Sequence, residues 1–242
     1  MRVDAEAGFV LHSTPYSETS LLVDLFTKSH GRIRCVAKGF RKPNKRGISR
    51  AIFPYTEHQF SWQGRGDLKT LTQADAINTP AFLQQECLFT GLYVNELLYR
   101  LLPEYDAHDY LYQQYSAFML RLVTEGPDEL MLRYLEMALL DELGYGLVLD
   151  SEVVHGTAVV AGKLYHYMPE QGLIELSSQH KEASGVYLGE DILGLIAGDF
   201  SQRSVMKTAK QLLRGVINFY LGGRQLHSRE LYRQHLLSRA PK

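Results

Sequence analysis

The sequence predicts an α+β protein in which a small N-terminal β-barrel precedes a mostly α-helical region with a small strand-containing insertion. Three observations predict this. Residues 1–80 hold short apolar or alternating stretches without a helical period. From Pro80 onward, apolar residues recur at helical spacing. Strand-like composition then returns over residues 147–176. We therefore expect two domains, at residues 1–80 and 81–242.

The N-terminal region divides into strands at turn-forming residues. Residues 20–27 are apolar and β-branched, and residues 32–39 alternate between apolar and basic side chains. Residues 56–63 and 67–77 flank a Gly-Arg-Gly turn at 64–66. Five or so short strands in about 80 residues fit a small barrel. Strand count alone does not separate an OB-type barrel from an SH3-like one.

Two large aromatic residues, Phe60 and Trp62, share one face of a predicted strand. Small barrels need large side chains inside, so we expect Phe60 in the core. Trp62 fits either the core or a surface on which a base stacks.

The rest of the chain alternates between helices and turns. The first helix covers residues 82–102 and ends at Pro103, the second covers 108–124, and a third runs from Pro127 to Gly144. Within the insertion we expect a hairpin around Gly162 and a turn at residues 170–172. Helical periodicity resumes near Asp191, covers 201–221, and begins again at Ser228, a good N-cap.

Charge is unevenly distributed although the net charge is only −1. Residues 1–80 carry 12 Lys/Arg and 7 Asp/Glu, residues 81–199 carry 5 and 19, and residues 200–242 carry 9 and 1. Basic ends around an acidic middle indicate a polyanionic or acidic partner, although solvated surface charges are the simpler alternative.

The strongest basic segment runs from Leu25 to Thr56, with nine Lys/Arg and no Asp or Glu. Single-stranded nucleic acid binds to positive grooves that follow its backbone. A solvated loop is the alternative, and the missing acidic residues favour nucleic acid. The candidate DNA-binding residues are Arg32, Arg34, Lys38, Arg41, Lys42, Lys45 and Arg46.

A second basic feature lies in the helix predicted at 201–221. Its cations recur at i, i+4, i+7 and i+11, so they form a ridge on one side of an amphipathic helix. We expect this ridge either to be a solvated face or to bind DNA or an acidic peptide. The candidate partner-binding residues are Arg203, Lys207, Lys210 and Arg214.

No catalytic or metal-binding motif is found. The chain lacks nucleotide-binding glycine motifs, GxSxG and HExxH, and its two cysteines, Cys35 and Cys87, are far apart. We therefore expect no catalytic residues, no metal and no cofactor. With no apolar stretch near 20 residues and no secretory leader, we expect a cytoplasmic protein that does not bind membranes.

Four segments, collinear over nearly the whole chain, resemble the RecO family of bacterial recombinational repair proteins. They are GFVLHSTPYSETSLLVDLFTKSHGRIRCVAKGFRK (8–42), GLYVNELLYRLL (91–102), ALLDELGYG (138–146) and YLGGRQLHSRELYRQ (220–234). Some members carry a four-cysteine zinc module, but residues 147–176 contain no Cys, so the chain resembles the zinc-less branch.

The resemblance implies an N-terminal OB-fold and a recombination mediator that is not an enzyme. Such proteins bind single- and double-stranded DNA and anneal complementary strands. They partner RecR and the acidic C-terminal tail of single-stranded DNA-binding protein, and so help RecA to load. Two alternatives remain open on the residues alone: an RNA-binding OB-fold adaptor without annealing, and a hydrolase whose carboxylate site forms only in three dimensions.

Overall fold

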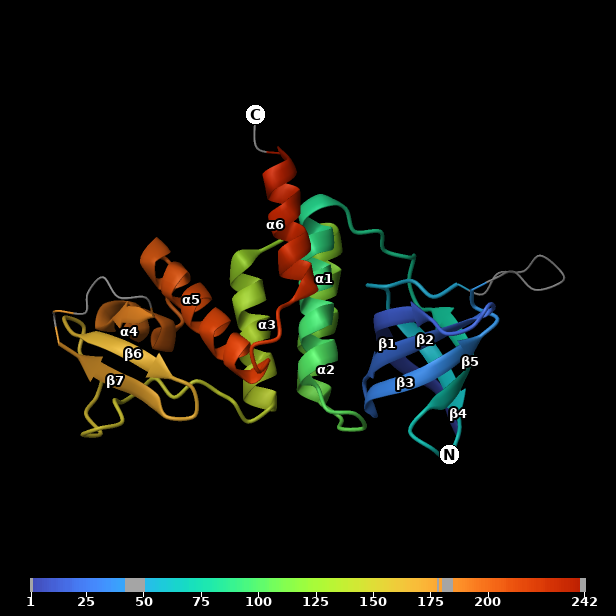
Figure 1. Cartoon of the computed structure of the whole chain (residues 1–242), viewed down its shortest axis with the longest axis horizontal. Coiled ribbons are helices and arrows are strands. Elements are labelled where there is room, and N and C mark those ends of the chain that lie inside the picture. Colours follow the sequence, from blue (N-terminus) through green and yellow to red (C-terminus); the bar gives the residue numbers. More distant parts are fainter. Residues whose placement is uncertain (1, 42–50, 178, 180–184, 240–242) are drawn as a thin grey trace. The chain divides into compact units, whose positions relative to one another are not determined.

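The computed structural model describes residues 2–41, 51–177, 179 and 185–239 (Figure 1). The chain divides into two compact units. The first comprises residues 1–127 with 226–242, and the second comprises residues 128–225. Each unit combines helices with a β-sheet, so the predicted α+β class is confirmed.

Five of the described strands close into a barrel in the order β1-β2-β3-β5-β4, with β4 pairing back onto β1. Among the described barrel strands, only β3 and β5 pair in parallel. This order is that of an OB-fold, so it decides against the SH3-like alternative. The strands are β1 (Arg2–Pro15), β2 (Ser20–Thr27), β3 (Gly31–Lys38), β4 (His58–Gln63) and β5 (Lys69–Ala76).

The barrel interior is filled by side chains from all five strands, including Val10, Leu25 and Ile33. Phe60 and Trp62 are both 0% exposed and belong to this core. The prediction for Phe60 is confirmed. Trp62 also fills the core, so it is not a surface on which a base can stack.

Strand β1 is the one barrel strand for which the sequence predicted no range. Its residues Gly8 to Leu11 are buried in succession, because Val10 faces the barrel core while Phe9 faces Tyr112 and Tyr115 of helix α2 (Asp109–Thr124). A strand buried on both faces loses the alternation by which strands are recognised.

Helices α1 (Gln85–Leu101) and α2 (Asp109–Thr124) cover one side of the barrel. Phe9 and Phe26 point outward from the barrel and pack edge-on against Tyr115 of α2, with ring centroids 5.0 and 5.8 Å apart. Asn95 of α1 is buried at the same place. Its Nδ2 donates to the carbonyls of Val10 (3.1 Å) and Leu11 (3.3 Å). Its Oδ1 accepts the Tyr115 hydroxyl proton at 2.6 Å.

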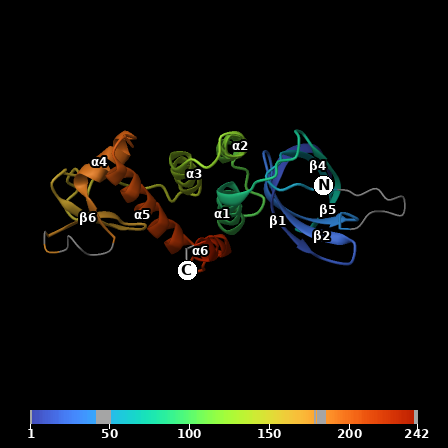
Figure 2. The same ribbon diagram turned by 90° about the horizontal axis from the view of Figure 1, so that it is seen from above.

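The last helix, α6 (His227–Arg239), lies beside α1 (Figure 2). The backbone N–H groups of His227 and Ser228 donate to the Glu96 carboxylate at 3.0 and 2.8 Å, and so does the Ser228 hydroxyl. The helix begins one residue before Ser228, so the prediction that Ser228 is the N-cap is wrong. A carboxylate from α1 caps the helix instead.

The second unit consists of α3 (Glu129–Glu142), α4 (Gly189–Ala197), α5 (Arg203–Tyr220) and a small antiparallel sheet in the order β7-β6-β8. Its strands are β6 (Leu164–Met168), β7 (Gly172–Leu176) and β8 (Val186–Leu188). The turn predicted near Glu170 joins β6 to β7, which confirms it. Strand β8 lies beyond residue 176, so the sheet extends further along the chain than predicted.

The hairpin predicted around Gly162 is wrong. Between α3 and β6 the chain, which is described throughout this segment, makes only isolated bridges, such as Ser151 with Ala158. The reason is Glu152, whose buried carboxylate accepts hydrogen bonds from the N–H groups of Val154 and His155 at 2.8 and 2.7 Å. These bonds give the backbone an alternative to strand pairing.

We expect Asn95→Leu to lower the free energy of unfolding by about 2–4 kcal/mol, because it leaves two strand carbonyls and a tyrosine hydroxyl buried without partners. Urea denaturation monitored by circular dichroism measures this change. Asn78→Leu makes the same substitution at an exposed position and is expected to change stability by no more than about 0.5 kcal/mol. Equal effects of the two variants would contradict this role for Asn95.

Candidate nucleic-acid interface

Two exposed cations, Lys38 and Arg41, lie at one end of the barrel. Lys38 is the last residue of β3 and pairs in register with Ser20. The Arg41 N–H donates to the Thr19 carbonyl at 3.2 Å, and its guanidinium donates to the Ser17 carbonyl at 2.9 Å. Both cations therefore adjoin the β1–β2 turn.

The same turn carries Tyr16, whose side chain is 57% exposed. A phenol ring beside two cations offers a stacking surface together with phosphate contacts, which are the two needs of a single-strand site. Lys38, Arg41 and Tyr16 together form what we call the barrel-end cluster. Among the described residues, no acidic side chain forms an ion pair with Lys38 or Arg41.

Three of the predicted DNA-binding residues, Lys42, Lys45 and Arg46, lie outside the described residues. Their contribution stays a prediction.

Arg32 and Arg34 differ from the barrel-end cluster, because both are held by acidic residues. Arg32 Nη1 and Arg34 Nε lie 3.1 and 2.9 Å from the same oxygen of Asp24, whose side chain is only 2% exposed. Arg32 Nη1 also lies 3.2 Å from Glu104. Burial opposes the charged form of Arg34, but the hydrogen bond and charge of Asp24 outweigh it and raise the pKa. Two cations and two anions leave little net charge, so a contact of these arginines with DNA stays a prediction.

The sequence held a signal for this network. Asp24 precedes the acid-free segment by one residue and lies directly across from Arg34 in the β2–β3 hairpin. Facing positions of a hairpin follow from its turn, and opposite charges there attract each other. Counting charges along the chain misses such a pairing.

The outward face of β2 and β3 is largely closed to ligands. OB-folds commonly bind oligonucleotides on strands 2 and 3 and on the β1–β2 and β4–β5 loops. Here Phe26 is 0% exposed and Val36 is 6% exposed. The β1–β2 turn remains open, and so does the β4–β5 turn, where Arg65 is exposed. The sequence placed Arg65 in a turn without assigning it to the interface.

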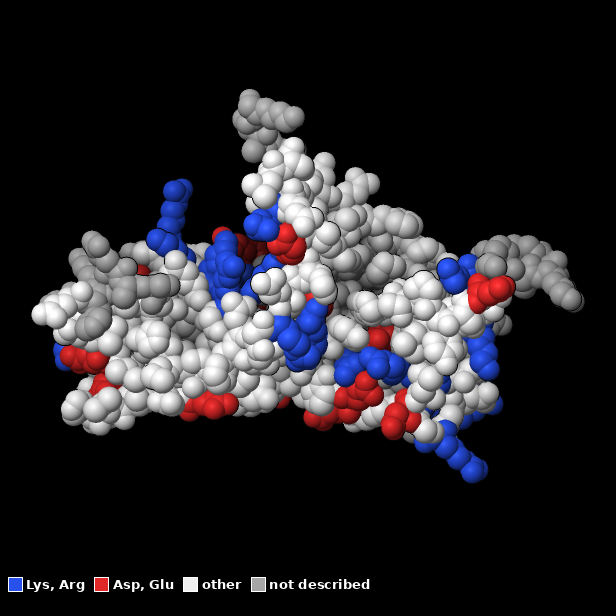
Figure 3. Space-filling view, in the orientation of Figure 1, with Lys and Arg blue, Asp and Glu red and all other residues white. Residues whose placement is uncertain are grey.

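In the second unit, the expected cationic ridge is present on α5. Lys and Arg side chains gather over this helix in the space-filling view (Figure 3). Lys210 Nζ lies 2.7 Å from Glu129 of α3. The opposite side, including Val205, Leu212 and Val216, is buried, so the predicted amphipathic helix is confirmed. The exposed cations are Arg203, Lys207, Lys210 and Arg214.

The described part of the chain shows no group of three or more His, Cys, Asp or Glu side chains arranged to hold a metal ion. None of the described helices has the length and apolar character needed to cross a membrane.

Comparisons with known proteins agree over nearly the whole chain. The family model for the N-terminal part of recombination protein O matches residues 1–80, and the model for its C-terminal part matches residues 86–230. The chain is 40% identical to a DNA repair protein RecO of Pseudomonas paraeruginosa, over 94% of both chains. It is 38% identical to one of Azoarcus sp., over 97% of both chains. With one of Cupriavidus metallidurans it shares 36% identity over 96% of this chain and 77% of the relative. The chain therefore belongs to the RecO family of DNA repair proteins.

Proposed function

We propose that this protein is a recombination mediator that binds single- and double-stranded DNA and anneals complementary strands. It acts with RecR and single-stranded DNA-binding protein to help load RecA. The observation that carries the proposal is the barrel-end cluster, an exposed cationic and aromatic surface on the OB-fold of a RecO-family chain. The proposal includes no covalent step and assigns no catalytic residue.

Annealing has simple physical requirements. Two polyanionic strands approach each other only when their phosphate charge is neutralised, while their bases must remain free to pair. Lys38 and Arg41 supply positive charge, and Tyr16 can hold a base by stacking without reading its edge. Because the outer face of β2 and β3 is covered, it offers no extended groove that could enclose a single strand. This favours contacts that neutralise phosphates and leave the bases free to pair.

The interaction with single-stranded DNA-binding protein is assigned to the α5 ridge. Four exposed cations lie along one helix, and among the described residues only Lys210 has an acidic partner, Glu129. Such a row suits an acidic peptide. Thr208 anchors the buried side of the helix, since its hydroxyl donates to Asp191 of α4 at 2.9 Å. A helix held in this way presents the ridge rigidly.

The annealing function predicts that the protein accelerates pairing of complementary strands coated with single-stranded DNA-binding protein. Lys38→Ala with Arg41→Ala is expected to slow this reaction, measured by fluorescence energy transfer between labelled strands. The matched control is Arg121→Ala with Lys163→Ala, which removes two cations already paired with Glu125 and Glu175. No acceleration by the unaltered protein would refute annealing. Preference for RNA over DNA of one sequence would favour an RNA-binding adaptor instead.

The four cations between residues 41 and 46, here called the basic loop, predict a steep dependence of DNA affinity on salt. Each phosphate contact contributes roughly 0.7 log units per log unit of salt for single strands and 0.9 for duplexes. Replacing Arg41, Lys42, Lys45 and Arg46 by Ala is expected to flatten the slope accordingly in fluorescence anisotropy titrations. Arg34→Gln is expected to change it less, because Asp24 already neutralises Arg34. An unchanged slope in the loop variant would remove the loop from the site.

The α5 assignment predicts that Lys207→Glu with Lys210→Glu weakens binding of the acidic C-terminal peptide of single-stranded DNA-binding protein about tenfold or more. The first substitution turns an attraction into a repulsion, and the second leaves the Glu129 carboxylate unpaired beside another negative charge. Titration of a fluorescent peptide measures this change. Lys163→Glu with Arg224→Glu reverses two charges elsewhere in the same unit and is expected to have little effect. Wild-type affinity of the α5 variant would contradict the assignment.

A further inference from the structure

The segment that joins α1 to α2 places one tyrosine, Tyr105, against the β4–β5 turn of the barrel. The Tyr105 N–H donates to the Arg32 carbonyl of β3 at 3.0 Å. The next residue lies against Gly31, where a Cβ would collide with the Asp106 carbonyl. The segment can therefore lie this close to β3 only because residue 31 is glycine.

The side chain of Tyr105 contacts this turn in two ways. Its hydroxyl donates to the Asp67 carbonyl. The Lys69 ammonium lies over the ring, 4.9 Å from the ring centroid, and donates to the Gly66 carbonyl at 2.7 Å. Lys69 is only 6% exposed, so its ammonium is held between the ring and the turn. One face of the ring and the hydroxyl are thus occupied within the chain.

Tyr105 nevertheless remains 40% exposed. Because Lys69 covers one face of the ring, a ligand can reach the other face. The φ of Tyr105 is +63°, a left-handed conformation that is unfavourable for a residue with a side chain. Non-glycine residues held in such conformations cluster at ligand-binding and switch regions. An accessible aromatic face that is kept in place at this backbone cost indicates a ligand that stacks on it.

The charge beside the ring suits an anionic ligand. Arg65 of the same turn is exposed, and among the described residues no acidic side chain forms an ion pair with it. The turn and its flanks, residues 64–69, hold two cations and one carboxylate, that of Asp67. A cation and an accessible aromatic ring are the two features that bind a phosphate and a base of single-stranded nucleic acid.

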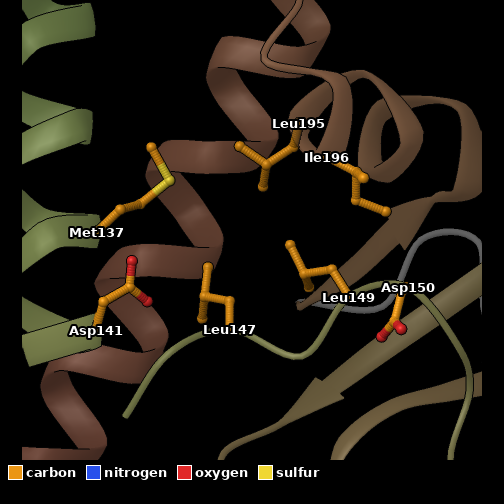
Figure 4. Close-up of a pocket in the computed structure, with 7 residues that line it drawn as sticks. All are labelled: Met137, Asp141, Leu147, Leu149, Asp150, Leu195 and Ile196. Carbon is orange, nitrogen blue, oxygen red and sulfur yellow. The ribbon is translucent and has the colours of Figure 1, made fainter. Parts of the chain in front are cut away.

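Charge distinguishes this surface from a depression in the second unit, between α3, α4 and the segment that follows α3 (Figure 4). Five of the seven residues that line the depression are apolar. The other two, Asp141 and Asp150, are exposed carboxylates, which repel phosphate. Its lining therefore offers a nucleic acid neither positive charge nor an aromatic face.

We propose that Tyr105 is a second position at which a base of single-stranded DNA stacks, and that Arg65 binds a phosphate beside it. The inference rests on the DNA binding proposed above and adds a contact that the barrel-end cluster does not contain. Tyr105 belongs to none of the barrel strands or their turns, so the stacking face comes from the segment between two helices. Every base has a face that can stack, so the contact does not depend on sequence.

One strand can occupy both contacts. Lys69 pairs in register with Cys35 of β3, and Lys38 of the barrel-end cluster lies three residues further along that strand. Three residues span about 10 Å of a β-strand. Single-strand sites on one OB-fold cover roughly 4–16 nucleotides, which is enough to reach both contacts. The strand is then held at two separate points, and the bases between them stay free to pair.

Photo-crosslinking of the full chain to oligothymidylate that carries 5-iodouracil tests the contact directly, because iodouracil reacts with an aromatic ring on which it stacks. Mass spectrometry of the digested product is expected to locate crosslinks at Tyr105 as well as at Tyr16. Tyr110, which is 56% exposed on α2, reports crosslinks that follow from exposure alone. Crosslinks at Tyr110 as frequent as those at Tyr105 would overturn the proposal.

Variants separate stacking from support of the turn. Tyr105→Leu removes the ring and is expected to weaken binding of oligothymidylate about fivefold or more in fluorescence anisotropy titrations. Tyr105→Phe keeps the ring and loses only the hydroxyl bond to Asp67, so its affinity is expected to stay within about twofold of the unaltered protein. Tyr110→Leu is the matched control and is expected to have little effect. Equal losses in Tyr105→Phe and Tyr105→Leu would mean that the tyrosine only supports the turn.

The phosphate contact has its own measurement. Arg65→Ala is expected to reduce the slope of log affinity against log salt by roughly 0.7, the contribution of one phosphate of a single strand. Arg121→Ala removes a cation already paired with Glu125 and is expected to leave the slope unchanged. Asp67→Asn removes the opposing carboxylate and is expected to tighten binding. An unchanged slope in Arg65→Ala would overturn the assignment of Arg65.

The same titrations distinguish this inference from the function on which it rests. If the unaltered protein does not bind oligothymidylate, both are wrong. If it binds, and Lys38→Ala with Arg41→Ala weakens binding while Tyr105→Leu does not, the proposed function stands and the contact at Tyr105 is refuted.

Discussion

The burial of one side of the barrel against α1 and α2 is the constraint on which the rest of the first unit depends. Phe9 and Phe26 point out of the barrel and need an apolar cover, which Tyr115 provides. The carbonyls of Val10 and Leu11 are buried at the same place, and Asn95 satisfies both. A polar group buried without a partner is costly, so this amide fixes where α1 lies on the barrel.

This packing also determines where the barrel can meet a ligand. The helices close the outer face of β2 and β3, which many OB-folds use for oligonucleotides, and leave the β1–β2 turn open. Arg32 and Arg34 lie toward the covered side and are neutralised by Asp24 and Glu104. Lys38 and Arg41 lie at the open end. Cations from a single basic segment therefore take two roles: some stabilise the unit, and others remain available for phosphate.

The second unit carries an exposed cationic ridge on helix α5. The ridge lies on an element fixed by burial, because Val205, Leu212 and Val216 hold α5.

The sequence by itself determined the class of fold, the strands β2 and β3, the first helices and the amphipathic character of α5, because local periodicity and turn residues encode these features. It did not reveal β1 as a strand, since burial on both faces removes alternation. It also did not show that Glu152 would replace a hairpin by a loop, or that Glu96 would cap α6 in place of Ser228. Above all, it did not separate Arg32 and Arg34 from Lys38 and Arg41. Only the tertiary structure decided which cations are neutralised, because their acidic partners come from another strand and from the segment after α1, and Coulomb attraction depends on distance in space rather than along the chain.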